Sequence, residues 1–121
     1  MKALKIETDG TMQVVEITGK TEEEQNHCIY GLIGGYFEIV RLSRDAVMLV
    51  DEDGLIKGLK QNPLAMIIAE YPMLVGTALV IGMKRTPPDD EEFVDCPERF
   101  LRFADKINTM MPGRKDESDH D

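Results

Sequence analysis

The chain has 121 residues, of which 42% are hydrophobic, so it is long enough for one globular domain with a core and too short for two. Its 23 acidic and 14 basic side chains leave a net charge of −9. That charge opposes binding to nucleic-acid backbones and anionic lipid, because both rely on Lys and Arg. We therefore expect neither a direct nucleic-acid partner nor a membrane partner.

The acidic excess is concentrated near the end of the chain, since residues 1–85 carry a net charge of −3 and residues 86–121 carry −6. The longest apolar stretch, residues 71–83, is too short to span a bilayer and contains a proline and two glycines. The first ten residues lack the apolar segment of a secretory signal. Both cysteines are expected to be reduced thiols, and the composition predicts a cytoplasmic domain.

The first predicted elements are two strands joined by a tight turn. Apolar and polar residues alternate over residues 2–8, which is the period of a half-buried strand. Asp9-Gly10 follows and is a strong turn signal, because glycine tolerates the positive φ that such turns need. Residues 12–18 then complete a predicted β-hairpin.

A helix is predicted next, over residues 21–32. Thr21 is a typical N-cap, and Glu24 at the third helical position would complete a capping box. The glycines that follow precede a strand, whereas phosphate-binding loops run from a strand through glycines into a helix. We therefore interpret Gly34 or Gly35 as the left-handed residue that ends the helix.

The second half of the chain continues the mixture of strands and helices. Strands are predicted over residues 36–42 and 46–52, and the turn at Asp51–Gly54 leads into an optional short strand over residues 55–59. The remaining predicted elements are a helix over residues 63–71 capped by Asn62, a strand over 75–83, a loop over 84–92 and a helix that begins between Asp95 and Glu98.

This order predicts an α+β fold with a largely antiparallel sheet of about five or six strands and two or three helices, in the order ββα-ββ(β)-α-β-α. Residues 1–111 are expected to form one globular domain, and residues 112–121 a disordered acidic tail. The strands at 46–50 and 75–83 are apolar on both faces. A sheet face that the helices left uncovered would bind a partner or a second copy, forming a homo-oligomer.

No catalytic or metal-binding set is visible in the sequence. Only two histidines are present, and His120 lies in the predicted tail, so no Ser/His/Asp set can be assembled. His27 and Cys28 are neighbours on a predicted helix and project about 100° apart, which makes a shared metal ion difficult. We therefore predict a protein without catalytic residues, cofactor or metal.

Strand 36–42 places one charged residue on each of its two faces. Glu38 shares a face with Tyr36, and Arg41 lies on the opposite face. A charged side chain on a covered strand needs a partner, so both residues are candidates for ligand contact. The alternative is a structural ion pair or a side chain that reaches water.

An acidic run in the predicted loop has no local explanation. It consists of Asp89, Asp90, Glu91 and Glu92. Such a surface could imitate the phosphates of DNA and occupy a basic groove on another protein. The alternative is a solvated acidic face that aids solubility.

Four segments together resemble one family. They are the start MKALKIETDG, the segment LIGGYFEIVRL, the turn VDEDGLIKGLKQNPLA and the strand VGTALVIG. In this order they are similar to a family of small proteins of unknown function from phages, conjugative elements and Gram-positive bacteria. The resemblance covers about residues 1–95 and carries no activity, cofactor or catalytic residue.

The resemblance implies an accessory protein of a phage or mobile element in a bacterial cytoplasm. The doubly apolar central strands and the missing catalytic set favour a non-catalytic binding module that engages a host protein or a small ligand, with strand 36–42 and helix 63–71 as the expected contact region. If the shared motifs mark a site, the matching polar positions are Tyr36, Glu38, Arg41, Glu52, Lys57 and Asn62. Two other functions stay open. One is an acidic inhibitor that mimics nucleic acid, and the other is a small enzyme that uses Glu38 with Arg41.

Overall fold

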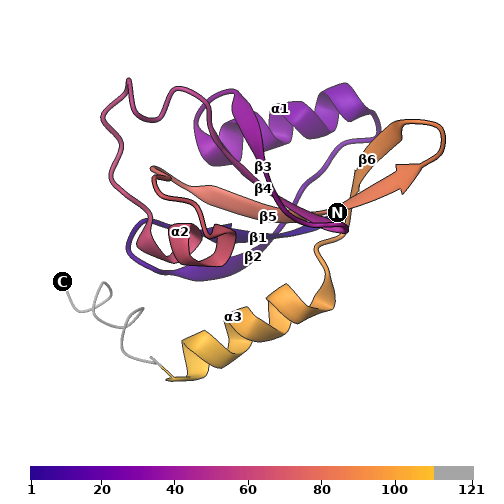
Figure 1. Cartoon of the computed structure of the whole chain (residues 1–121). Coiled ribbons are helices and arrows are strands. Elements are labelled where there is room, and N and C mark those ends of the chain that lie inside the picture. The colour runs from indigo at the N-terminus through magenta and orange to yellow at the C-terminus, as the bar shows by residue number, and fades with distance from the viewer. Residues whose placement is uncertain (111–121) are drawn as a thin grey trace.

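The computed structural model describes residues 1–110, which form six strands and three helices (Figure 1). In chain order they are β1 (Lys2–Ile6), β2 (Met12–Glu16), α1 (Glu22–Ile33), β3 (Phe37–Ser43), β4 (Ala46–Asp51), α2 (Pro63–Ala69), β5 (Ala78–Thr86), β6 (Asp90–Val94) and α3 (Glu98–Met110). The predicted α+β class is confirmed. The tail predicted over residues 112–121 lies outside the described residues.

All strands belong to one antiparallel sheet with the order β2-β1-β5-β4-β3. β5 lies at its centre and pairs along one edge with β4. Along its other edge it pairs first with β1 and then with β6, since Leu4 is opposite Val80 and Glu92 is opposite Lys84. β3 is an edge strand that follows directly after α1, so the end of this helix and the start of β3 lie close together.

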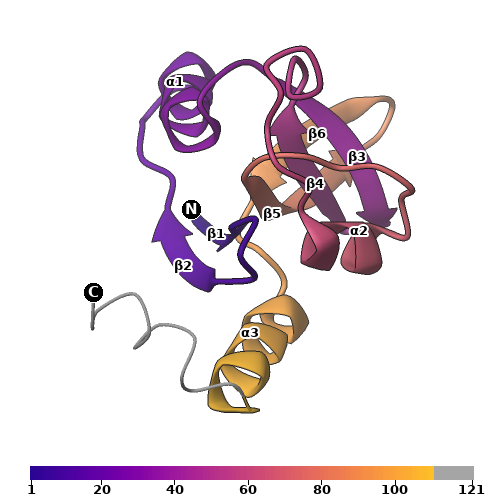
Figure 2. The ribbon, with the colours of Figure 1, turned by 90° about the vertical axis from the view of Figure 1, so that its left-hand side faces the viewer.

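Helices cover the two faces of the sheet, with α1 on one side and α2 and α3 on the other (Figures 1 and 2). The buried core on the α1 side includes Ile29, Ile33, Val47, Leu49, Leu79 and Ile81. The core on the opposite side includes Leu4, Ile6, Met48, Val50, Val80 and Ala104. Neighbouring residues of β4 and β5 therefore point to different cores, as expected for strands that are apolar on both faces.

The central strands are covered within a single chain. Every residue of β4 and the first six residues of β5 are buried. The uncovered face that the sequence suggested therefore does not lie on these strands. Exposed apolar side chains occur instead around the end of α1, on β3 and in the segment after β4, where Tyr36, Ile39 and Ile56 are examples.

Several local signals in the sequence are confirmed. Gly10 has a φ of 88° in the β1–β2 turn. At the start of α1 the backbone N–H of Glu24 donates to the hydroxyl of Thr21, and the Glu24 carboxylate accepts from the backbone N–H of Thr21, both at 3.1 Å. Gly34 ends the helix in the left-handed conformation with a φ of 92°. These groups satisfy backbone atoms that the helix leaves unpaired.

The optional strand over residues 55–59 does not form. Residues 52–58 make a series of turns instead, in which Leu55 and Ile56 are exposed. The side chain of Lys57 turns back toward β4 and reaches Asp51. A short apolar run cannot predict this contact, because its partner lies on the preceding strand.

The prediction of a loop over residues 84–92 is wrong. β5 continues to Thr86, and β6 pairs with it as a hairpin. In this hairpin Lys84 lies opposite Glu92 and Arg85 lies opposite Glu91. Charged residues have a low intrinsic preference for β-strands, but cross-strand pairs of opposite charge stabilise a hairpin that contains them.

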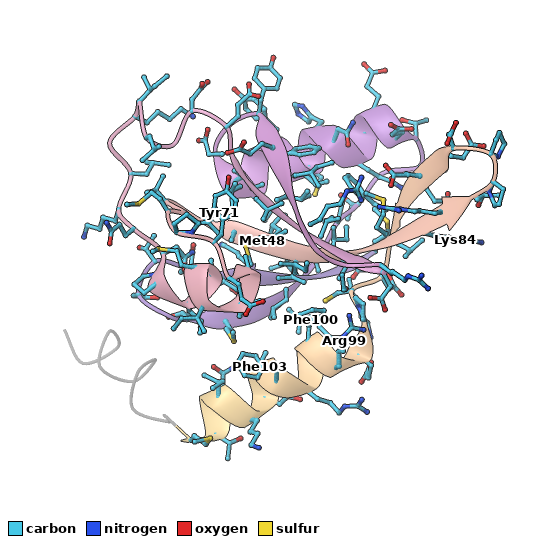
Figure 3. All side chains as sticks on the ribbon, in the orientation of Figure 1. Met48, Tyr71, Lys84, Arg99, Phe100 and Phe103 are labelled. Carbon is cyan, nitrogen blue, oxygen red and sulfur yellow. The ribbon has the colours of Figure 1, made fainter. Side chains whose placement is uncertain are left out.

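Helix α3 is attached to the rest of the fold at its start. Its Arg99 donates two hydrogen bonds to the carboxylate of Asp45 in the β3–β4 turn, at 2.7 and 2.9 Å. Phe100 packs against the core on this side of the sheet (Figure 3). Asp95, expected at the helix start, instead accepts a hydrogen bond from the backbone N–H of Lys2 and ties the connection to β1. None of the helices in residues 1–110 has the length and apolar character that crossing a membrane requires.

Candidate binding site

Lys57 belongs to a structural cluster at the end of α1. Its ammonium group lies 2.7 Å from Asp51, whose side chain is only 2% exposed, and donates to the carbonyl of Gly34 at 3.1 Å. The other Asp51 oxygen accepts from the backbone N–H of Asp53 at 2.8 Å. The hydrogen bond to Asp51 raises the pKa of Lys57 above its ordinary value, so the ammonium stays charged beside the carbonyl end of the helix, where cations are favoured.

Gly35 makes room for this cluster. A Cβ atom at Gly35 would lie 2.6 Å from the nitrogen of Lys57 and 3.0 Å from a carboxylate oxygen of Asp51. The two adjacent glycines therefore have different tasks, since Gly34 supplies the left-handed backbone and Gly35 permits the close approach of an ion pair. The Lys57 ammonium group thus makes two contacts within the fold, to Asp51 and to the end of α1.

Asn62 is structural as well. Its side chain is buried, and its oxygen accepts from the backbone N–H of Ala65 at 3.1 Å, which caps α2. Its amide nitrogen donates to the carbonyl groups of Ile6 and Gly76 at 3.0 and 2.9 Å. All three bonds are internal to the fold, so Asn62 has no group directed at a ligand.

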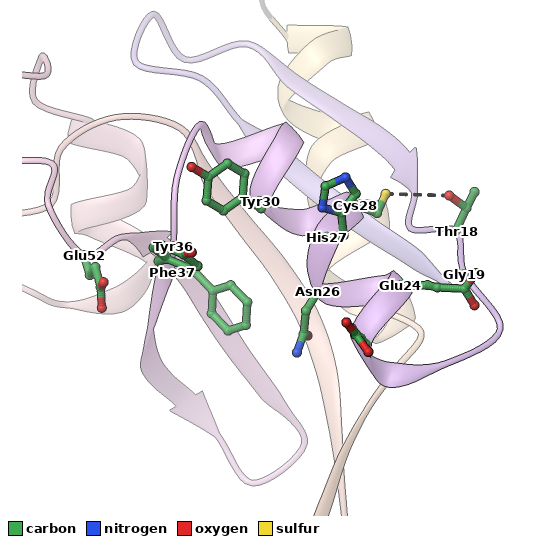
Figure 4. Close-up of a pocket in the computed structure, with 11 residues that line it drawn as sticks. Thr18, Gly19, Glu24, Asn26, His27, Cys28, Tyr30, Tyr36, Phe37 and Glu52 are labelled. Carbon is green, nitrogen blue, oxygen red and sulfur yellow. Dashed lines mark hydrogen bonds between the residues drawn. The ribbon is translucent and has the colours of Figure 1, made fainter.

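Tyr36 and Glu52 lie together beside an open cleft along α1. We call this cleft the aromatic groove, and its lining includes Asn26, His27, Tyr30, Tyr36, Phe37 and Glu52 (Figure 4). The backbone N–H of Glu52 donates to the carbonyl of Tyr36 at 3.0 Å, which extends the β3–β4 pairing by one residue and places the two side chains at the same end of the sheet.

Two tyrosines make the aromatic part of this groove. The rings of Tyr30 and Tyr36 meet edge to face, with centroids 5.0 Å apart and an interplanar angle of 79°. Tyr36 is nevertheless 69% exposed, so the ring has a free surface. A large aromatic side chain that is held by a neighbour and still faces solvent is typical of a binding surface.

The charged side chains of the groove are mainly acidic. Its lining contains three glutamates, Glu23, Glu24 and Glu52, and one histidine, His27, but no lysine or arginine. Hydrogen bonds from the backbone of Lys20 and Thr21 lower the pKa of Glu24, which keeps that carboxylate ionised. Aromatic faces beside carboxylates form an environment that favours an ammonium or guanidinium group.

Glu38 and Arg41 lie on opposite faces of β3, as predicted. Arg41 donates to both carboxylate oxygens of Glu91 at 3.1 Å, and Arg85 contacts the same carboxylate at 2.8 Å. The hydrogen bond from Arg41 is the main cause that lowers the pKa of Glu91. Glu38 is exposed and does not line the aromatic groove. The structure therefore does not bring Glu38 and Arg41 into one site.

The acidic run is partly neutralised by its neighbours. Glu91 is held by two arginines, and Glu92 lies opposite Lys84 in the β5–β6 hairpin. Asp89 and Asp90 are exposed at the end of this hairpin. The acidic surface is therefore smaller than four consecutive carboxylates in a loop would give.

Within residues 1–110, no three His, Cys, Asp or Glu side chains are grouped so that they could hold a metal ion. Burial raises the pKa of the Cys96 thiol to about 11, which leaves little thiolate at neutral pH. Helix α2, the second expected contact region, exposes Ile67 and does not line the aromatic groove.

Sequence reasoning missed the helical half of the aromatic groove. Glu23, Asn26, His27 and Tyr30 recur at intervals of three and four residues, which places them on one side of α1. That spacing was a usable signal. Asp51 was also missed as a buried partner, because no local pattern distinguishes it from the acidic turn residues that follow.

The family to which the chain belongs follows from comparison with known proteins. No curated protein and no solved structure matches the chain. One family model, described as a domain of unknown function (DUF3846), matches residues 1–108, from the first residue to near the end of α3. The match agrees with the expected membership of a family without assigned function and extends beyond residue 95. Because it spans most of the sequence, the chain belongs to the family of the domain of unknown function DUF3846.

Proposed function

We propose that this protein is a non-catalytic binding protein that holds a positively charged segment of a partner protein in the aromatic groove. The observation that supports this function is the exposed Tyr36 ring, held edge to face by Tyr30 and placed beside Glu52. The sequence motifs resemble those of a family from phages and mobile elements. We therefore expect this protein to be an accessory protein of such an element, and its partner to be a host protein in a bacterial cytoplasm.

The chemistry of the groove favours a cation over a neutral ligand. An Arg or Lys side chain over a tyrosine face gains about 0.5–1 kcal/mol when exposed and about 2 kcal/mol when desolvated. A carboxylate at the edge of the same groove adds a charge-assisted hydrogen bond. Glu52 is exposed and available for this role, whereas the charge of Lys57 is already matched by Asp51.

A protein segment fits the shape of the groove better than a small enzyme substrate does. The cleft is open along α1, and its lining contains no nucleophile paired with a base. Cys28 lies in it with the Thr18 hydroxyl donating to its sulfur at 3.8 Å, and a hydroxyl group does not serve as the base that takes the proton from a thiol. Proteins bind peptide segments in open grooves and along exposed sheet edges, whereas small-molecule sites bury most of the surface of their ligand.

The test is binding of synthetic peptides to the full chain. Nine-residue peptides that contain two arginines in a Gly/Ser background are compared with matched peptides that contain two glutamines, by isothermal titration calorimetry at low and at physiological salt. We expect the arginine peptides to bind more tightly and to lose affinity as salt rises, because screening weakens contacts between exposed charges.

The matched variants are Tyr36→Ala and Tyr71→Ala. Both tyrosines are exposed, and only Tyr36 lines the aromatic groove. We expect Tyr36→Ala to weaken arginine-peptide binding about fivefold, which corresponds to one exposed cation–π contact, and Tyr71→Ala to leave it unchanged. Equal binding of arginine and glutamine peptides, or equal effects of the two variants, would contradict the proposed function.

A further inference from the structure

The strand β3 has a free edge. It is the last strand in the sheet order, so β4 is the strand of the described chain that pairs with it (Figure 2). Its regular pairing runs from Phe37 to Arg41 and ends at an irregularity between Arg41 and Ser43. This stretch contains neither Pro nor Lys, which commonly protect an edge from pairing with another chain.

The register of β3 shows which of its backbone groups point away from β4. The N–H of Glu52 donates to the carbonyl of Tyr36, so these two residues form a hydrogen-bonded pair. Such pairs alternate with non-bonded pairs along an antiparallel ladder, and β3 keeps this register through Arg41. The N–H and C=O groups of Phe37, Ile39 and Arg41 therefore face outward. An extended polypeptide offers matching donors and acceptors at the same spacing.

The opposite edge of the sheet is partly covered, whereas the edge of β3 is not. The side-chain amide of Asn108 on α3 donates to the carbonyl of Met12 in β2 at 3.3 Å. Within residues 1–110, no side chain or loop donates to the outward carbonyl groups of β3 or accepts from its outward N–H groups. The edge of β3 is therefore the better site for an added strand.

The charges along this edge favour a basic segment over a second copy of the chain. Glu38 and Glu52 are exposed, and neither carboxylate forms an ion pair or a hydrogen bond with a residue of the described chain. The cation nearest to Glu38 along β3, Arg41, is already paired with Glu91. The net charge of −9 opposes the approach of a second copy and attracts a segment that carries Lys or Arg.

We propose that the basic segment of the partner binds as an added strand along the free edge of β3. This inference rests on the proposed function and specifies how the partner is held. The backbone of the segment pairs with Phe37, Ile39 and Arg41, and its chain continues past the start of β3 into the aromatic groove. Residues directly opposite each other point to the same face. The segment therefore carries Arg or Lys opposite Glu38 and an apolar or β-branched residue at the adjacent position, opposite Ile39, which is 44% exposed.

Backbone methylation of a peptide tests the added strand with the wild-type protein. The probe is a capped seven-residue peptide in which valine and arginine alternate. One derivative carries N-methyl groups on two valines and the other on two arginines, so their side chains and charge are the same. With arginine opposite Glu38, the valines pair with the outward groups of β3. We expect N-methyl-valine to weaken binding at least about tenfold in isothermal titration calorimetry, and N-methyl-arginine to change it less than about twofold.

The outcomes distinguish this inference from the proposed function. Equal effects of the two derivatives, or no binding of the unmethylated peptide, would overturn the added strand. If Tyr36→Ala still weakened the arginine peptides, the aromatic groove would remain the binding site. A loss confined to N-methyl-arginine would overturn the register opposite Glu38. A loss confined to N-methyl-valine, without a preference for arginine over glutamine peptides, would overturn the proposed function and the basic segment.

Two proline variants locate the edge that the peptide uses. Ile39→Pro removes an outward N–H from β3. Val14→Pro is the matched control on β2, because Val14 is 47% exposed and the mutual hydrogen bonds of Met1 and Ile17 place its N–H outward as well. Edge strands tolerate proline where the N–H faces solvent. We expect Ile39→Pro to weaken peptide binding about fivefold or more and Val14→Pro to leave it unchanged, while both keep the wild-type circular dichroism spectrum.

Sedimentation velocity of the chain alone separates the partner segment from a second copy. We expect a monomer at micromolar concentration. A dimer that Ile39→Pro dissociates and Val14→Pro does not would overturn the partner segment, because a second β3 would then occupy the edge.

Discussion

Lys57 lies 2.7 Å from the buried carboxylate of Asp51 and, through a second hydrogen bond, holds the carbonyl of Gly34 at the end of α1. One side chain thus joins the turn after β4 to the end of the first helix. The edge strand β3 starts three residues after Gly34, so this cluster also sets the position of Tyr36 at the aromatic groove.

The pairing of Asp51 predicts that Lys57 is needed for stability. In Lys57→Met the carboxylate of Asp51 stays buried without its cation, which is a costly arrangement. We expect the midpoint of thermal unfolding to fall, whereas the neighbouring exposed control Lys60→Met should leave it unchanged. Removing the charge as well, in Asp51→Asn with Lys57→Met, should restore part of the loss. A double variant that is less stable than Lys57→Met would contradict the unpaired-charge explanation.

The glycines of α1 should respond to alanine in opposite directions. Gly34 has a φ of 92°, so Gly34→Ala should destabilise the fold by about 1 kcal/mol. Gly31 lies inside the helix, where an added Cβ atom would have open space around it, and Gly31→Ala should stabilise the fold by about 0.5–1 kcal/mol. Urea unfolding followed by circular dichroism measures both. The same sign for both variants would show that the helix does not end at Gly34.

The side chain of Asn62 has two roles, since it caps α2 and also donates hydrogen bonds to the carbonyl groups of Ile6 and Gly76. Asn62→Ala removes the cap of α2 and the amide donor of two buried carbonyl groups, and we expect a loss of about 2 kcal/mol or more. Asn62→Asp keeps one oxygen for the cap, but its second oxygen replaces the amide donor and faces the carbonyl groups of Ile6 and Gly76. Denaturant unfolding should therefore find Asn62→Asp no more stable than Asn62→Ala. Near-native stability of Asn62→Asp would show that the amide donors contribute little.

The attachment of α3 should depend on pH. The hydrogen bond from Arg99, followed by that from Ser43, holds the pKa of Asp45 well below its ordinary value of 3.8. A carboxyl whose folded pKa is lowered stabilises the fold above its unfolded pKa, and this contribution disappears as pH falls through the folded pKa. We expect the free energy of unfolding to decrease below about pH 4.

The variant Arg99→Met tests the origin of that pH dependence. Without the guanidinium, Asp45 should titrate nearer its ordinary pKa, so the variant should lose less stability than the wild type between about pH 4 and pH 2. Arg102→Met on the same helix is the control and should follow the wild type. Glu24 and Glu91 also have lowered pKa values, and they contribute equally to all three proteins. Identical pH profiles would exclude Arg99 as the cause.

Features that depend on neighbouring residues were determined by the sequence alone. The turn at Gly10, the capping box of Thr21 and Glu24, the glycine end of α1 and the Asn62 cap all involve hydrogen bonds between residues at most four positions apart. The alternation of residues also determined that Glu38 and Arg41 lie on opposite faces of β3. These features need no knowledge of the sheet order, because the chain forms them within a single turn or strand.

The tertiary structure decided which of these residues meet. Lys57 contacts Asp51, Arg41 contacts Glu91, and Tyr30 contacts Tyr36 only because the folded chain brings separate elements together. The same holds for the β5–β6 hairpin. Its charged sequence is typical of a loop, but residues of opposite charge face each other across the two strands and stabilise them. Such contacts depend on strand order and register, which are set by packing of the whole core and leave no signal within a short window of sequence.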